Sequence, residues 1–286
     1  GEFLSMEISL RFFDRERLWM IFVKRRRLKL IDFDKMQGSG NDFIVINSIE
    51  NTYKLSKSKI KKLSDRNFGI GFDQVILIGP PTKDSFDFSI RFFNADGGEA
   101  SMCLNGIRCA ASYVWRNNFA PKKSITFKTK NRHVLCEPSN NQVKALLKIP
   151  SQHIDAKLHS KLAKLISDKF DFVDAGNMHL CIKSSSIKKK DLNSIYKNLE
   201  KLIRPFGFNV SIYKISKNIA EMRTYENGVG ETFSCGSAAL AVTSLCIKNK
   251  FKTISPGGEL NFIKKNNANI EMIGPAKYIY SGNIDV

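Results

Sequence analysis

Apolar and polar residues alternate along much of the chain, which is the pattern of β-strands that bury one face. The clearest example is Phe86–Phe93, where Phe86, Phe88, Ile90 and Phe92 fall on the same side. The chain is therefore expected to consist mainly of β-structure. Further strands are predicted at Leu30–Phe33, Phe43–Asn47, Asp73–Ile78, Ser124–Lys128, His133–Glu137, Val143–Ile149, Phe170–Val173, Leu180–Ile182, Val210–Ile215, Asn218–Thr224 and Tyr278–Ile284.

Apolar residues spaced three and four apart predict a few helices among these strands. Two of them are strongly apolar, and each follows a cysteine. One begins after Cys103 and continues to about Asn117, and the other covers Ser237 to about Lys248. We expect each apolar helix to fill the centre of a strand-rich part of the chain. Two more helices are predicted at Ser56–Arg66 and Asp191–Ile203.

The two cysteine stretches, Asn94–Cys109 and Glu226–Ala239, read as copies of each other. In both, a Gly-Glu pair stands five and four residues before the cysteine, and Cys235 follows Cys103 by 132 residues. Matches in the same order at similar offsets predict an internal duplication. Two further pairs of segments repeat in this way: Gly40-Asn41 with Gly176-Asn177, and Arg66–Gly69 with Arg204–Gly207.

The duplication predicts the domain organisation. A chain of 286 residues with 42% hydrophobic residues is long enough for two domains with their own cores. We expect residues 30–149 to form a first half that carries Cys103 and is completed by the strand 276–286. Residues 150–275 form the second half with Cys235, and residues 1–29 are expected to be a tail outside the fold.

Charge and cysteine usage narrow the class of protein. The net charge of +19 is compatible with binding to nucleic acid or to a membrane surface, but the lysines are scattered and no apolar run is long enough to span a membrane. The six cysteines form no C-x-x-C pair and have no histidine at zinc-ligand spacing. We therefore expect free thiols, no metal, and a cytoplasmic location.

A thiol at the start of a helix lies at the positive end of the helix dipole, where thiol pKa values fall. A single cysteine in this position is compatible with a buried structural residue. Two cysteines in duplicated contexts favour a functional pair. Inverting a stereocentre by proton exchange needs a base on one face of a carbon and an acid on the other, and two thiols can fill both roles.

Asn94–Cys109 and Tyr225–Ala239 resemble the two signatures of the diaminopimelate epimerase family. The resemblance extends from about residue 30 to the C-terminus. It implies an α+β fold of two pseudo-symmetric halves, each a β-barrel-like sheet around a central helix, with the site between them. It also implies a homodimeric isomerase that needs no cofactor and converts LL- to meso-diaminopimelate, a precursor of lysine and peptidoglycan. Blocks that match in order are Gln37–Phe43, Gly69–Gln74, Gly176–His179 and Pro256–Gly258.

The resemblance implies a role for each matching site residue. Cys103 and Cys235 correspond to the acid/base pair, and His179 and Glu226 to residues that assist proton transfer. The backbone amides of Gly236 and Ser237 correspond to contacts with the α-carboxylate, where a helix N-terminus favours an anion. The other substrate-contacting positions are Asn41, Gln74, Asn94, Asn105, Asn177 and Asn209, together with Leu104, Glu226 and Asn227.

Three positions depart from the family pattern. Leu104 stands in place of a glycine after the first cysteine, Met178 in place of a proline, and Asn227 in place of an arginine that helps to hold the distal carboxylate. An asparagine cannot supply the bidentate charged fork of arginine, and Arg223 is the nearest alternative cation in sequence. These departures leave open a racemase of another amino acid, and the net charge leaves open a non-catalytic RNA-binding protein.

Overall fold

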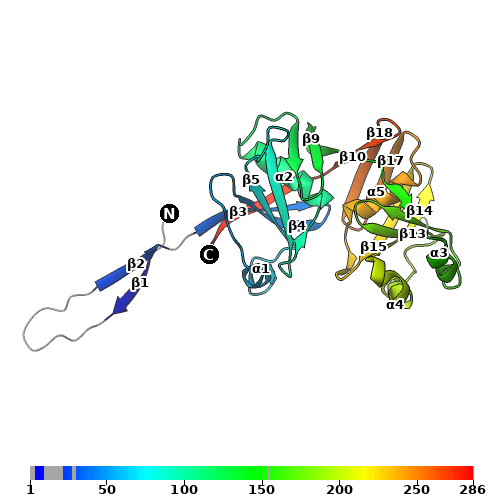
Figure 1. The fold of residues 1–286 in the computed structure, drawn as a ribbon, viewed down its shortest axis with the longest axis horizontal. Coiled ribbons are helices and arrows are strands. Elements are labelled where there is room, and N and C mark those ends of the chain that lie inside the picture. The colour runs from blue at the N-terminus through cyan, green and yellow to red at the C-terminus, as the bar shows by residue number, and fades with distance from the viewer. Residues whose placement is uncertain (1–3, 10–21, 28–29, 154, 286) are drawn as a thin grey trace, which may run out of the picture.

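The computed structural model describes residues 4–9, 22–27, 30–153 and 155–285. Figure 1 shows two lobes side by side, with helix α2 (Leu104–Arg116) in one and helix α5 (Gly236–Ser244) in the other. Strands β1 (Leu4–Ser9) and β2 (Phe22–Arg27) pair antiparallel with each other, in a two-stranded sheet separate from the main one. The tail and the domain boundaries given above stay predictions.

The first lobe holds the elements from β3 to β10, and the second lobe holds those from β11 to β19. The first set is β3 (Leu30–Gly38), β4 (Asn41–Asn47), α1 (Lys57–Ser64), β5 (Gln74–Gly79), β6 (Phe88–Asn94), β7 (Glu99–Ala100), α2, β8 (Ile125–Lys128), β9 (His133–Ser139) and β10 (Gln142–Lys148). The second set is β11 (Ser151–His153), α3 (Ala156–Leu162), β12 (Phe170–Asp174), β13 (Met178–Lys183), α4 (Leu192–Ile203), the 3₁₀ turn Arg204–Phe206, β14 (Asn209–Ser216), β15 (Ile219–Glu226), β16 (Gly230–Thr232), α5, β17 (Lys250–Ser255), β18 (Gly258–Lys264) and β19 (Asn269–Gly274).

Both lobes use the same order of strand pairing. In the first, β4 pairs parallel with β5 and β6 pairs parallel with β8, while the other neighbours are antiparallel. In the second, β13 pairs parallel with β14 and β15 pairs parallel with β17. The predicted α+β fold of two pseudo-symmetric halves is therefore confirmed. The halves are linked where β10 pairs with β19, and β20 (Lys277–Asp285) returns to pair with β3 (Figure 1).

The two central helices are almost entirely buried. In α2, even Arg108 and Asn105 are buried, and in α5 the run from Ala238 to Thr243 is buried. Both helices belong to one continuous hydrophobic cluster. Each fully buried Leu, Ile or Phe side chain contributes about 1.5–3 kcal/mol. This packing holds the start of each helix, and hence each cysteine, in a defined place.

One predicted helix is too long, and one helix was not predicted. The helix after Cys235 ends at Ser244 rather than near Lys248, because the amides of Cys246 and Ile247 both turn back to the Thr243 carbonyl at 2.9 Å. Helix α3 was not predicted; its N-cap, Asp155, accepts a bond from the Leu158 amide at 2.8 Å. In the part of the chain that the structure describes, no helix has the length and apolar character needed to cross a membrane.

Candidate active site

Cys103 and Cys235 are the N-cap residues of α2 and α5. Both have extended backbone conformations, with φ of −141° and −119°, so the chain enters each helix directly after the thiol. The Gly106 amide donates to Cys103 Sγ at 3.4 Å. Free backbone amides at the first turn of a helix favour negative charge. The prediction that both cysteines open helices is confirmed.

The first turns of the two helices touch each other across the two halves. A Cβ atom placed on Gly236 would lie 2.9 Å from Leu104 Cβ, so only a glycine allows this approach. The side-chain amide of Asn105 donates to the Ser234 carbonyl at 3.3 Å, just before Cys235. The helix N-termini are therefore brought together by Leu104 and Asn105 on one side and by Ser234 and Gly236 on the other.

Glu226 links the surroundings of the two thiols. Burial raises its pKa, while hydrogen bonds from Thr232 and Cys235 act in the opposite direction. Thr232 Oγ1 donates to Glu226 Oε1 at 2.6 Å. Burial raises the pKa of Cys103 to about 12 and raises that of Cys235 well above its ordinary value, and the Glu226 charge adds to both shifts. The two thiols thus lie near the same buried carboxylate.

His179 lies on the Cys235 side of the site. Its Nε2 is 3.0 Å from Asn177 Oδ1 and 3.1 Å from Ser237 Oγ, and Ser237 Oγ is 3.3 Å from Cys235 Sγ. Because Asn177 Oδ1 only accepts, the proton is on Nε2 and Nδ1 carries a lone pair. Burial lowers the pKa of His179 to about 4, so the ring is neutral at physiological pH. The arrangement connects Asn177 to Cys235 through a neutral imidazole and a hydroxyl.

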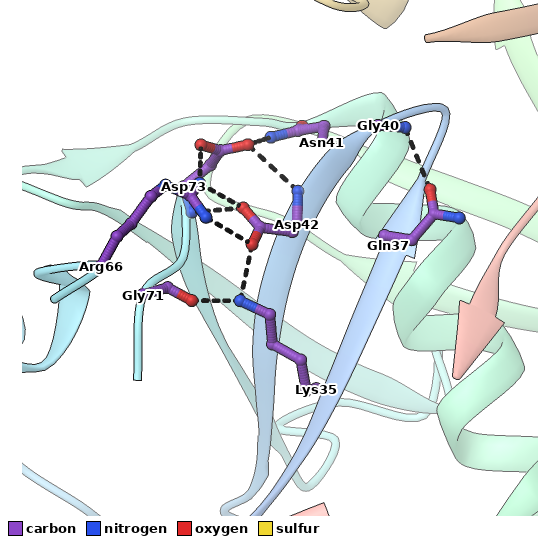
Figure 2. A network of polar contacts seen from close by, with 8 residues as sticks. All are labelled: Lys35, Gln37, Gly40, Asn41, Asp42, Arg66, Gly71 and Asp73. Carbon is purple, nitrogen blue, oxygen red and sulfur yellow. Dashed lines mark hydrogen bonds and ion pairs between the residues drawn. The ribbon is translucent and has the colours of Figure 1, made fainter. Parts of the chain in front are cut away.

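Asn41 lies on the Cys103 side of the site, at the start of β4. The Cys103 thiol donates to Asn41 Oδ1 at 3.6 Å, and Asn41 Nδ2 donates to Asp73 Oδ2 at 2.6 Å. Figure 2 shows that Asp73 belongs to a cluster in which Arg66 bridges Asp42 and Asp73, and Lys35 bonds Asp42 and the Gly71 carbonyl. The ion pair with Arg66 fixes Asp73, and Asp73 in turn holds the Asn41 side chain by a hydrogen bond.

Two further pairs of predicted residues contact each other. Gln74 Nε2 donates to Asn94 Oδ1 at 2.8 Å. In the second half, Asn209 Oδ1 accepts from the Asn227 amide at 2.9 Å. The Asn227 side chain itself accepts from Tyr196 Oη at 2.8 Å. The Asn227 side chain therefore points toward α4, where its hydrogen-bond partner is the neutral Tyr196 hydroxyl.

Two predicted residues do not present a free side chain. Leu104 is buried, with 5% of its surface exposed, and its side chain joins the hydrophobic cluster. Asn105 is also buried: its Oδ1 accepts from Arg108 Nη2 at 2.9 Å while its Nδ2 bonds Ser234. Their backbone amides, at the first turn of α2, remain the groups that can meet a substrate.

Arg223 is not a replacement for the missing family arginine. Its guanidinium bonds both oxygens of Glu231, and Nη1 also donates to the carbonyls of Ile187 and Lys190 at 2.8 Å. Among the described residues, no group of three or more His, Cys, Asp or Glu side chains is placed to hold a metal ion. The six cysteines are free thiols, as predicted.

Sequence reasoning missed Asp73, Thr232 and Arg108. Asp73 directly precedes Gln74, and Thr232 follows the Gly-Glu pair of the second signature, so both stand inside recognised blocks without any pattern of their own. Arg108 is fully buried and donates to the Leu104 and Pro275 carbonyls at 3.3 and 3.2 Å. A charged residue on a helix is usually exposed, so nothing in the sequence indicated its burial.

Residues 33–147 match the family model described as diaminopimelate epimerase. A diaminopimelate epimerase from Buchnera aphidicola subsp. Acyrthosiphon pisum (strain 5A) is 37% identical over 278 residues, covering 90% of this chain and 96% of that protein. One from Acinetobacter baylyi is 32% identical, with coverage of 90% and 98%.

Solved structures share the fold at low identity. A phenazine biosynthesis protein of the PhzF family from Bacillus anthracis aligns with a TM-score of 0.66 at 14% identity, over 91% of this chain and all of that one. A hydroxyproline epimerase from Agrobacterium vitis, with bound trans-4-hydroxy-L-proline, aligns with a TM-score of 0.63 at 11% identity, over 90% and 93%.

Proposed function

The chain belongs to the diaminopimelate epimerase family, and we propose that its Cys103 and Cys235 thiols exchange the α-proton of LL-diaminopimelate to give the meso isomer. The observation that carries this proposal is the meeting of two helix N-termini, each capped by a cysteine from a different half. Family membership makes the protein an isomerase, which excludes the non-catalytic alternative.

The proton transfers balance within the pair of thiols. One cysteine, as thiolate, takes the α-proton from one face of the substrate and becomes a thiol. The other cysteine, as thiol, delivers its proton to the opposite face and becomes the thiolate. The carbanion formed between these steps spreads charge onto the α-carboxylate. Backbone amides at the first turns of α2 and α5, including those of Gly236 and Ser237, stabilise this charge.

The neighbouring side chains serve the two thiols differently. Glu226 is buried close to both thiols and accepts a hydrogen bond from Thr232, so it is placed to assist proton transfer in the site. His179 reaches Cys235 through Ser237 and holds that hydroxyl in place. Asn41 contacts Cys103 directly. The substrate-binding roles of Gln74, Asn94, Asn177 and Asn209 follow from their place in the family motifs.

A specific observation favours a second candidate, a racemase of another amino acid. Diaminopimelate carries a second carboxylate, and at the two positions considered for its recognition Asn227 is neutral and Arg223 is bonded to Glu231. We keep diaminopimelate as the substrate because both named relatives match over 90% of the chain. A cytoplasmic, pyridoxal-phosphate-independent homodimer that supplies lysine and peptidoglycan synthesis is part of the same proposal.

The experiment compares Cys103→Ala, Cys235→Ala and the control Cys246→Ala, which changes a cysteine outside the site. Each protein is incubated with LL-diaminopimelate in deuterium oxide without added cofactor. We expect the first two variants to lose epimerisation completely and the control to retain it. Full turnover by either site variant would contradict the two-thiol mechanism. A panel of neutral amino acids in the same assay separates the two candidate substrates.

A further inference from the structure

The Asn41 amide stands between a carboxylate and a thiol. Its Nδ2 donates to Asp73 Oδ2 at 2.6 Å, and its Oδ1 accepts from Cys103 Sγ at 3.6 Å (Figure 2 shows the Asp73 side). A carboxylate only accepts hydrogen bonds, so the NH₂ group must face Asp73. The amide oxygen is consequently the atom that faces Cys103.

Asp73 is itself held in place by the surrounding cluster. Arg66 Nη2 donates to Asp73 Oδ1 at 3.0 Å, and the Asp42 amide donates to Asp73 Oδ2 at 3.1 Å. The Asp73 amide in turn donates to Asp42 Oδ1 at 3.0 Å. Both carboxylate oxygens are thus engaged, which favours the orientation of Asp73 that bonds the Asn41 amide.

The fixed amide distinguishes the two thiols. An amide oxygen accepts but does not donate, so its hydrogen bond with Cys103 requires the proton to stay on sulfur. Cys235 Sγ instead lies 3.3 Å from the Ser237 hydroxyl, which can donate to a thiolate as well as accept from a thiol. The contact with Asn41 therefore favours the protonated form of Cys103, whereas the contact with Ser237 is compatible with either form of Cys235.

We propose that Asp73 is a positioning residue that locks the Asn41 amide and so keeps Cys103 protonated at rest. This inference rests on the proposed two-thiol function. The charged groups that face Cys103 are Glu226 from β15 and Arg108 from α2, and those that face Asp73 are Arg66, Asp42 and Glu226.

The test measures the protonation of each thiol without any substrate. The protein is treated with iodoacetamide at about pH 9, and mass spectrometry follows the alkylation rates of Cys103 and Cys235 separately. Below its pKa, a thiol is alkylated at a rate that follows its thiolate fraction. In Asp73→Asn the amide is free to turn its NH₂ group toward sulfur, which stabilises the thiolate. The alkylation rate of Cys103 should then rise about tenfold, which corresponds to a fall of about one unit in its pKa, while the rate of Cys235 stays unchanged.

The matched control is Asp42→Asn, which removes the same charge from the same cluster but does not bond the Asn41 side chain. This control should leave the alkylation rate of Cys103 close to that of the native protein. Asn41→Ala, which removes the acceptor itself, should raise this rate even if Asp73→Asn fails to fold. Equal rate changes in Asp73→Asn and Asp42→Asn, or an unchanged Cys103 rate in Asn41→Ala, would overturn the proposal. Because alkylation needs no turnover, a failure of the epimerase assay would be seen separately.

Discussion

Arg223 donates two parallel hydrogen bonds to Glu231, from Nε to Oε1 at 2.6 Å and from Nη2 to Oε2 at 2.8 Å. Arg91 and Glu99 repeat this geometry in the other half, at 2.9 and 3.0 Å. Both members of the pair recur 132 residues later, as the cysteines do. Each glutamate stands four residues before its cysteine, so each pair braces the turn that leads to a thiol.

The first prediction concerns these braces. Glu231→Gln and Glu99→Gln should each lower kcat roughly tenfold, because the turn before the thiol loses its charged anchor and the geometry of proton transfer loosens. The free energy of unfolding should change by less than about 1 kcal/mol, since both pairs are partly exposed. Glu259→Gln, which breaks the exposed pair with Lys252, is the control and should change neither quantity. Unchanged kcat in both brace variants would show that the pairs do not position the thiols.

The second prediction concerns Asn227. Because Arg223 is engaged, Asn227→Arg should add a cation for the distal carboxylate and raise kcat/KM for diaminopimelate. A charge-assisted hydrogen bond to the substrate would contribute roughly 1.5–3 kcal/mol of binding free energy. The substitution also removes the hydrogen bond from Tyr196 to Asn227, which costs about 1 kcal/mol. The control is Asn227→Gln, which changes size without charge. The assay compares kcat/KM for diaminopimelate with that for a neutral α-amino acid, and a variant with unchanged or weaker discrimination would mean that another group already binds the distal carboxylate.

The third prediction concerns pH and His179. Burial lowers the pKa of His179 from 6.5 to about 4 in the folded protein, so the unfolded chain binds the proton more readily. The stability that a neutral His179 contributes is complete above pH 6.5 and is lost as the pH falls toward 4, at up to about 1.4 kcal/mol per pH unit. His179→Gln should unfold with a shallower dependence on pH in this window, measured by urea titration. His153→Gln, at an exposed histidine, is the control. If the free energy of unfolding depends equally on pH in the native protein, His179→Gln and His153→Gln, the lowered pKa of His179 is contradicted.

The fourth prediction concerns Arg108. Arg108→Met should lower the free energy of unfolding by about 3 kcal/mol, because it leaves the buried acceptors on Asn105 and Pro275 without donors. Urea unfolding measures this loss. Arg204→Met, which breaks an exposed pair with Glu200 on α4, is the control and should change stability by less than about 0.5 kcal/mol. A small effect of Arg108→Met would mean that water replaces the guanidinium.

The amino-acid sequence by itself determined the repeating plan of the protein. Alternation over Phe86–Phe93 identified the strand now seen as β6, because side chains on a strand point to opposite faces with a period of two. The helix after Cys103 was found with its end within one residue, since its apolar spacing and its loop are local features. The helix after Cys235 was placed less well: α5 is apolar on every side, so its sequence contains no periodic signal for the end.

Only the tertiary structure decided which polar groups meet. Asp73 bonds an asparagine 32 residues earlier in the chain, and Asn105 bonds a carbonyl 129 residues later. Such contacts depend on how β4 lies beside β5 and on how the two halves approach, and no periodicity encodes either. The sequence also left Arg223 as a possible substrate ligand, and only the tertiary structure showed that it bonds Glu231 instead. Strand alternation predicts the face of a side chain, but the partner on that face is chosen by three-dimensional packing.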